Sequence, residues 1–339
     1  QELMCDKDFC TLYSLFMLAL ARKELSACSF RLFIGEKPNI TPVMNEDLST
    51  ETTNDELKEA FVDEWGVKYS KDGRKLLKVP GKLSGAYSVK EGTRIICDST
   101  FFFCGSLFEI VIPSSVTSIG DWAFSFCSSL IYISIPKSVI YLNGNPFAEW
   151  NGKLECLSPN YIYEDDILFN KDKSRIISFR NQNIESYVIP SSVTSIGDRA
   201  FYGCSSLSEI VIPSCVTSIG KGAFRGCYSL SEIVIPSSVT SIGDWAFSFC
   251  DSLSEIVIPS SVTSIGDSAF SGCSSLSEIV IPSSVTSIGD RAFSDCDSLS
   301  EIVIPSSVTS IGDRAFSCCL SLSEIVIPSS VTSIGDWAF

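Results

Sequence analysis

The sequence predicts a β-rich solenoid with short helical turns, wound from coils of 23 residues. The first observation is a proline that returns at a fixed interval, at Pro113, Pro136, Pro190, Pro213, Pro236, Pro259, Pro282, Pro305 and Pro328. The second is that the surrounding residues keep one pattern, of which Leu253–Cys273 (LSEIVIPSSVTSIGDSAFSGC) is a clear copy. A fixed period of this length is the signature of stacked repeats, each of which contacts its neighbours along the chain.

Composition narrows the classes of function. The 339 residues carry a formal charge of −15 and contain no histidine. The negative charge disfavours nucleic acids and anionic membrane surfaces as partners. Without histidine there is no Ser-His or Cys-His nucleophile pair and no histidine-ligated zinc site. No glycine-rich phosphate loop is found either, so we predict no catalytic residue, no bound metal and no cofactor.

Residues 1–35 form an apolar N-terminal segment. Phe9–Leu20 is an apolar run of 12 residues, shorter than a membrane span, and acidic residues precede it where a signal peptide would be basic. A membrane-spanning helix needs ~20 residues, so none is predicted. We interpret the run as a short buried helix, with a signal-peptide core as the alternative.

Residues 36–66 are interpreted as a polar linker followed by a capping helix. We expect Asn54 to cap this helix, Leu57, Phe61 and Trp65 to share one face, and Gly66 to end it. An amphipathic helix at this point would cover the open end of the first coil.

Two similar segments introduce the repeats. Residues 67–85 contain short apolar strands around Ser-Lys-Asp-Gly, which predict a lead-in hairpin, and the same unit returns as a hairpin insertion at 159–185. The chain is therefore divided into a first array at 86–158 and a second array at 186–339, which ends in mid-repeat.

Each repeat has an inward and an outward set of residues. In the copy at 253–273 the inward set is Leu253, Ile256, Ile258, Val262, Ile265, Ala269, Phe270 and Cys273. Glu255 and Val257 alternate with this set along a strand and should face solvent. Pro259 ends the strand, and we expect Asp267 to cap a one-turn helix.

Eight of the fifteen cysteines occupy one register of the repeat, at Cys104, Cys127, Cys204, Cys227, Cys250, Cys273, Cys296 and Cys319. Stacked strands lie ~4.8 Å apart, which permits disulfides, but side chains of one ladder position point the same way. We predict buried thiols that pack as small apolar groups, with disulfides or a reactive role as the alternative. The aspartate ladder that includes Asp267 lacks the spacing of a calcium loop, so helix capping is preferred.

The pattern L-x-x-I-x-I-P-x-x-V-x-x-I-G-D-x-A-F-x-x-C-x-x-L, with the lead-in YSKDGRKLLKVP, resembles the BspA-like, treponemal type of leucine-rich repeat. The resemblance covers about residues 67–339 and implies a right-handed leucine-rich repeat coil. Members of this family are mostly bacterial or protist surface or secreted proteins linked to adhesion. The last repeat stops at Phe339 without a polar cap, so Ile334 and Phe339 should be exposed. The chain is interpreted as the product of a truncated gene, a fragment or a partial assembly.

The outward strand positions are the candidate binding surface. Glutamates and valines recur there at Glu209, Val211, Glu232, Val234, Glu255, Val257, Glu278, Val280, Glu301 and Val303. Trp122 and Trp245 occupy a variable position after the aspartate, where exposed tryptophans would be binding hot spots. For both sets, the alternative is a solvated surface that duplication has copied.

These observations together predict a non-enzymatic protein-binding module that acts in adhesion at the cell surface or after secretion. The resemblance implies host matrix proteins or microbial surface proteins as partners. The alternative is a cytoplasmic protein-interaction scaffold, which free cysteines and the lack of a recognisable signal sequence would favour.

Overall fold

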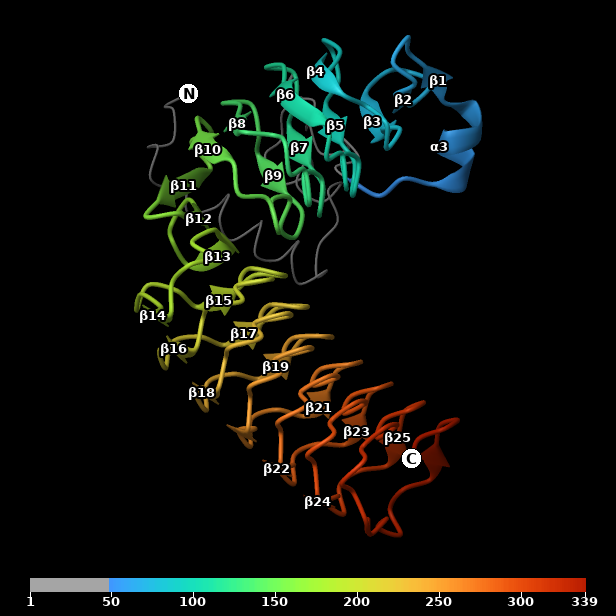
Figure 1. The fold of residues 1–339 in the computed structure, drawn as a ribbon, viewed down its shortest axis with the longest axis vertical. Helices are drawn as coiled ribbons and strands as arrows, with labels where there is room; N and C mark the ends of the chain where they lie inside the picture. Colours follow the sequence, from blue (N-terminus) through green and yellow to red (C-terminus); the bar gives the residue numbers. More distant parts are fainter. Residues whose placement is uncertain (1–48) are drawn as a thin grey trace, which may run out of the picture. The chain divides into compact units, whose positions relative to one another are not determined.

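The computed structural model describes residues 49–339, which belong to one compact unit. The predictions for residues 1–35 and for the linker as far as residue 48 lie outside the described residues. The described chain is a β-solenoid of about 11 turns with repeats of about 23 residues and almost no helix, which confirms the predicted fold class (Figure 1).

One row of parallel strands, which we call the long-strand row, carries the glutamate and valine ladders. In the first array it consists of the pairs β4 (Gly85–Ser88) with β6 (Leu107–Val111) and β8 (Tyr132–Ile135) with β10 (Lys153–Cys156). In the second array it is a single six-stranded sheet of β14 (Ser186–Val188), β16 (Glu209–Val211), β18 (Glu232–Val234), β20 (Glu255–Val257), β22 (Glu278–Val280) and β24 (Glu301–Val303).

A second row, the short-strand row, consists of two-residue strands that also pair in parallel. Its members are β5 (Ile95–Ile96), β7 (Ser118–Ile119), β9 (Tyr141–Leu142), β15 (Ser195–Ile196), β17 (Ser218–Ile219), β19 (Ser241–Ile242), β21 (Ser264–Ile265), β23 (Ser287–Ile288), β25 (Ser310–Ile311) and β26 (Ser333–Ile334). Between the two rows of each coil stands the recurring proline, which lacks the N–H that a further ladder bond would need. The period of the proline therefore sets the length of the coil.

The core lies between the two rows and follows the predicted inward set. All eight inward residues of the copy at 253–273 are at most 3% exposed. The phenylalanines stack on one another from coil to coil, with ring centroids 5.1–5.6 Å apart and planes within 16° of parallel from Phe201 to Phe339. Each ring therefore packs on two neighbouring coils, which ties the stability of a coil to that of its neighbours.

The described cysteines are free thiols, and seven of the eight in the ladder are fully buried, which confirms the packing role. The Cys273 thiol donates to the Phe247 carbonyl of the preceding coil at 3.2 Å, and Cys127, Cys227, Cys250, Cys296 and Cys319 make the same bond. Burial raises the pKa of the Cys273 thiol to about 12. These thiols therefore serve as small buried donors and are protonated at neutral pH.

The aspartate ladder does not cap helices, and that prediction was wrong. Asp267 Oδ1 accepts the backbone N–H of Asp290 in the next coil at 2.9 Å, and the chain after Asp267 forms turns without an α-helix. The glycine before each aspartate makes this bond possible, because a Cβ on Gly289 would lie 2.6 Å from Asp267 Oδ1. Only the stacking of coils brings this N–H to the carboxylate, so a single repeat could not reveal it.

The N-terminal end of the described chain combines a helix with a small antiparallel sheet. Helix α3 (Asn54–Glu59) is shorter than predicted, and Thr53 is its N-cap, in a capping box with Glu56. The chain becomes extended at Ala60 and forms β1 (Phe61–Val62), which pairs with β2 (Lys68–Tyr69) and through it with β3 (Lys75–Lys78). The predicted helical face was wrong because Phe61 stacks on Tyr69 within this sheet, with centroids 5.3 Å apart.

The insertion between the arrays is an antiparallel meander of β11 (Tyr161–Glu164), β12 (Ile167–Asn170) and β13 (Arg175–Phe179). Strand β13 then pairs in parallel with β15, so the ladder of the second array starts on it. Alternate side chains of β12 and β13 enter different cores: Leu168 and Ile177 pack into that of the first array, whereas Phe169 and Ile176 pack into that of the second. The meander thus separates the two cores and contacts both.

Candidate binding surface

The glutamate and valine ladders lie on the solvent side of the long-strand row, as predicted. In β16, β18, β20, β22 and β24 the central isoleucine is buried and the flanking glutamate and valine are exposed. The valine side chains are 46–70% exposed from Val211 to Val303. Identical residues face one another across each strand pair, for example Glu255 opposite Glu278 and Val257 opposite Val280. The structure therefore joins these residues into one continuous stripe.

The glutamates of this stripe bring like charges close together. Neighbouring parallel strands lie ~4.8 Å apart, and like charges directly opposite one another destabilise a sheet. Among the described residues, none forms an ion pair with Glu209, Glu232, Glu255, Glu278 or Glu301. The stripe is thus a row of uncompensated negative charge beside a row of exposed apolar side chains.

Trp122 and Trp245 lie on turns, outside the long-strand row, and both are half-buried where full exposure was expected. Each has a left-handed backbone, with φ of 58° and 54°. The Lys221 ammonium lies 4.4 Å from the centre of the Trp245 ring, and the Arg199 guanidinium lies 5.0 Å from that of Trp122. Cations from other coils therefore cover part of each ring.

A cluster of aromatic side chains around Trp122 was missed by the sequence analysis. The Trp122 ring stacks on Phe126, and Phe102 makes edge contacts with both. Tyr202, from the second array, meets Trp122 edge-on with centroids 4.7 Å apart. The signal that could have found this cluster is Phe102, which stands where the later repeats carry Ser271, Ser294 or Ser317.

The positive φ values mark a second missed feature. The residue that follows the aspartate has a left-handed backbone in coil after coil. Such residues include Trp122, Trp245, Ser268, Arg291 and Arg314, and Gly222 occupies the same position in its own coil. Non-glycine residues adopt this conformation at a cost of roughly 1 kcal/mol, so the glycine in one copy was the clue to the backbone of all the others.

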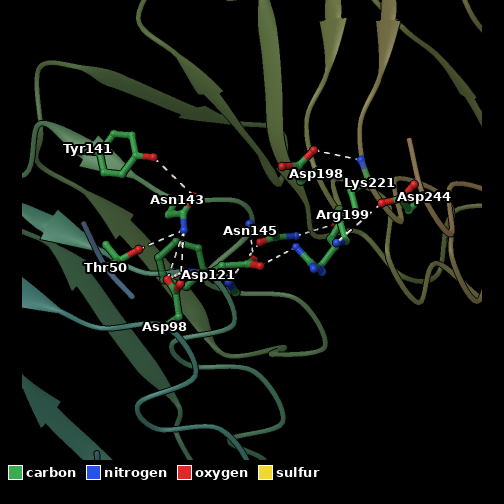
Figure 2. A network of polar contacts seen from close by, with 11 residues as sticks. Thr50, Asp98, Asp121, Tyr141, Asn143, Asn145, Asp198, Arg199, Lys221 and Asp244 are labelled. Atoms are coloured by element: carbon green, nitrogen blue, oxygen red, sulfur yellow. Dashed lines mark hydrogen bonds and ion pairs between the residues drawn. The ribbon is translucent and has the colours of Figure 1, made fainter. Parts of the chain in front are cut away.

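A polar network joins the two arrays near Trp122 (Figure 2). Asp121 forms a largely buried ion pair with Arg199, and Asn145 Nδ2 donates to the Arg199 carbonyl at 2.8 Å. The Asp121 N–H donates to Asp98 Oδ1 at 2.8 Å, as in the other members of the aspartate ladder. Burial raises the pKa of Asp121 to about 6, although the Arg199 charge acts in the opposite direction. Side chains thus carry the coil-to-coil contacts across the point where the repeat is interrupted.

Comparison with known families agrees with this geometry. Residues 86–164, 175–296 and 264–339 match the model of the BspA type leucine-rich repeat region, with six copies. The protein belongs to the BspA-type leucine-rich repeat family. Among proteins with curated descriptions, no sequence matches the chain.

Solved structures of other leucine-rich repeat proteins share the fold. A leucine-rich repeat protein from Eubacterium ventriosum is 29% identical, with a TM-score of 0.61, and the match covers 75% of this chain and 82% of that one. A leucine-rich cell surface protein from Faecalibacterium prausnitzii is 32% identical, with a TM-score of 0.51 and coverage of 72% and 60%. The pneumococcal vaccine antigen PcpA, 23% identical with a TM-score of 0.54 and coverage of 75% and 63%, is similar in fold.

The BspA-type fold is a repeat scaffold, and such scaffolds typically present binding surfaces and do not carry out catalysis. Within residues 49–339, no group of three histidine, cysteine, aspartate or glutamate side chains is placed to hold a metal ion. A search of the same residues found no helix long and apolar enough to cross a membrane.

Proposed function

We propose that this chain is a non-enzymatic protein-binding module that acts in adhesion at the cell surface or after secretion, and that its partner docks on the long-strand row. The observation that carries the proposal is the stripe over β16–β24, in which exposed valines lie beside glutamates that form no ion pair within residues 49–339. Exposed charge without a partner destabilises a sheet, so its repetition over five strands is better explained by a ligand than by stability.

The chemistry of the stripe suggests the chemistry of the partner. Lysine or arginine side chains of the partner would neutralise the glutamates, and an apolar strip would cover the valines. Because the positions repeat every ~4.8 Å along the row, the complementary surface is an extended, basic and repetitive protein segment. The similar protein from Faecalibacterium prausnitzii is described as a cell surface protein, which supports the proposed location.

The experiment is to capture purified extracellular matrix and microbial surface proteins with the full chain and to measure affinity by biolayer interferometry. The variant Glu232→Gln, Glu255→Gln, Glu278→Gln should bind at least about 10-fold more weakly and lose most of its salt dependence, since charge-assisted contacts dominate such interfaces.

A control variant makes the same chemical change elsewhere. Asp251→Asn, Asp295→Asn, Asp297→Asn also removes three carboxylates, but these lie on turns outside the long-strand row. This control should bind as the unchanged chain does. Equal loss in both variants would show that only net charge matters and would refute docking on the stripe.

The cytoplasmic scaffold stays as a second candidate because the described cysteines are all free thiols. Secreted proteins tend to oxidise exposed cysteines, and Cys318 is exposed. Labelling intact source cells with a membrane-impermeant biotin reagent separates the two candidates, because a surface protein is labelled without lysis and a cytoplasmic protein is not.

A further inference from the structure

A cleft of about 620 Å³ lies where the meander meets the end of the first array. Its walls come from the start of β10, from the β11–β12 turn and from the chain that follows β13. The β11–β12 turn and the chain after β13 lie outside the repeats. This combination of walls therefore occurs once among the described residues, whereas the surfaces of the repeats recur from coil to coil.

Arg180 is the central charged group of this cleft. Its Nη2 donates to the Gly152 carbonyl at 2.6 Å, and its guanidinium carbon lies 4.4 Å from the centre of the Trp150 ring. Its Nε and Nη1 are closed to solvent and make no hydrogen bond of good geometry within the described chain, although the nearby Tyr163 hydroxyl and Asp166 carboxylate stabilise the charge. Buried charged donors are rarely left without full compensation because their desolvation is costly. The positive charge at this wall would attract an anion into the cleft.

The surroundings hold Arg180 in a defined position. Trp150 Nε1 donates to the Leu130 carbonyl at 2.6 Å, which fixes the ring beneath the guanidinium. The Arg180 N–H donates to the Asp166 carbonyl at 2.8 Å, and the Tyr163 hydroxyl donates to Asp166 Oδ1 at 3.0 Å. The cation is therefore preorganised, which lowers the entropic cost of binding.

The charge of the lining is positive although the chain carries −15. Arg180 and Lys153 contribute two cations, and Asp166 is the single carboxylate among the lining residues. Most of the other lining groups are carboxamides, among them Asn151 and Asn181. A carboxamide both donates and accepts, as a sugar hydroxyl does. The one aliphatic residue of the lining, Leu154, is buried, and the Tyr163 ring is half-buried.

We propose that this cleft binds an acidic sugar, with Arg180 and Lys153 holding its carboxylate and the carboxamides bonding its hydroxyls. A flexible acidic peptide would fit less well, since the lining offers no exposed aliphatic side chain to pack against it. The site is separate from the glutamate and valine stripe over β16–β24, so it adds a saccharide ligand to the proposed protein-binding function.

The test measures binding of methyl β-D-glucuronide and of the neutral methyl β-D-glucoside to the full chain by isothermal titration calorimetry. The glucuronide should bind about 10- to 100-fold more tightly, because a hydrogen bond between charged groups contributes that much to an equilibrium constant. Arg180→Gln should abolish this preference. Lys153→Gln, an exposed position, should weaken glucuronide binding about 3- to 10-fold without affecting the fold.

Lys171→Gln is the matched control, since Lys171 is exposed on the same meander but does not line the cleft. It should leave the affinity unchanged. Equal binding of glucuronide and glucoside, or unchanged glucuronide binding in Lys153→Gln, would overturn the proposal even if Arg180→Gln failed to fold. Tighter binding of inorganic phosphate or of N-acetyl-aspartate amide than of the glucuronide would also overturn it, because the site would then recognise an anion without a sugar.

Discussion

Removing one ring from the phenylalanine stack tests whether neighbouring coils stabilise one another. Phe270 is fully buried and lies between Phe247 and Phe293, with both centroid distances 5.5 Å. In Phe270→Ala the coil loses its largest core side chain, and both neighbours lose a stacking partner. We therefore expect the damage to reach the coils on either side.

The magnitude follows from burial and from the two contacts. Truncating a buried phenylalanine to alanine costs about 3–5 kcal/mol, which includes the cavity that remains. Each stacked pair adds about 0.5–1.5 kcal/mol beyond burial, so the upper end of the range is expected for Phe270. Phe249, in the preceding coil, is 42% exposed. Phe249→Ala removes the same atoms from the surface and should cost only about 1 kcal/mol.

The assay is native-state hydrogen exchange, supported by urea unfolding followed by circular dichroism. Exchange reports each coil separately, which matters because repeat arrays can unfold in parts. Phe270→Ala should lower protection in its own coil and in the coils of Phe247 and Phe293, while Phe249→Ala should leave protection largely unchanged. Loss confined to one coil, or equal loss in the two variants, would refute the nearest-neighbour reasoning.

Three further predictions concern the coil-to-coil contacts. Gly243→Ala places a Cβ 2.6 Å from the Lys221 backbone nitrogen and should lower the free energy of unfolding in urea by about 2–3 kcal/mol. Gly222→Ala, whose Cβ would have its nearest neighbour at 3.4 Å, should lower it by about 1 kcal/mol because of its positive φ. The reverse order of the two losses would contradict the close approach of the coils. Burial raises the pKa of Asp121 to about 6, so the folded state holds the proton of this carboxyl group more tightly than the unfolded chain does. The contribution of Asp121 to the free energy of unfolding therefore falls as the pH rises from about 4 to about 6. The difference in free energy of unfolding between the unchanged chain and Asp121→Asn should therefore vary over that pH interval. A constant difference would contradict the raised pKa of Asp121. In a thiol titration with Ellman's reagent at pH 8, Cys318→Ala should remove one fast-reacting thiol and Cys273→Ala none; a lost fast thiol in Cys273→Ala would mean that the ladder is accessible.

Several features of the fold could be predicted from the sequence because the same residue pattern occurs in many consecutive repeats. Ile256, Phe270 and Cys273 recur at positions whose spacing places them on the same side of each coil, which predicts a common core. Alternation along a strand then assigned Glu255 and Val257 to the solvent side, and their exposure in the structure confirms this.

The errors arose where a residue's partner lies in another coil. Asp267 was assigned to its own turn, but it bonds to the coil that follows, 23 residues along the chain. Trp122 was expected to be exposed, but Arg199 and Tyr202, which come from beyond the meander, cover its ring. In both cases the residue was interpreted from its own repeat alone, although its partner lies in another coil.

The sequence by itself therefore determined the coil length, the two-sided pattern of each strand and the position of the thiols in the core, because these depend on side-chain polarity and period alone. Only the tertiary structure decided which backbone N–H each aspartate meets, how Leu168 and Phe169 divide between two cores, and where Arg180 is left with unpaired donors. These features depend on the stacking of coils and on the meander between the arrays, and no single repeat carries that information.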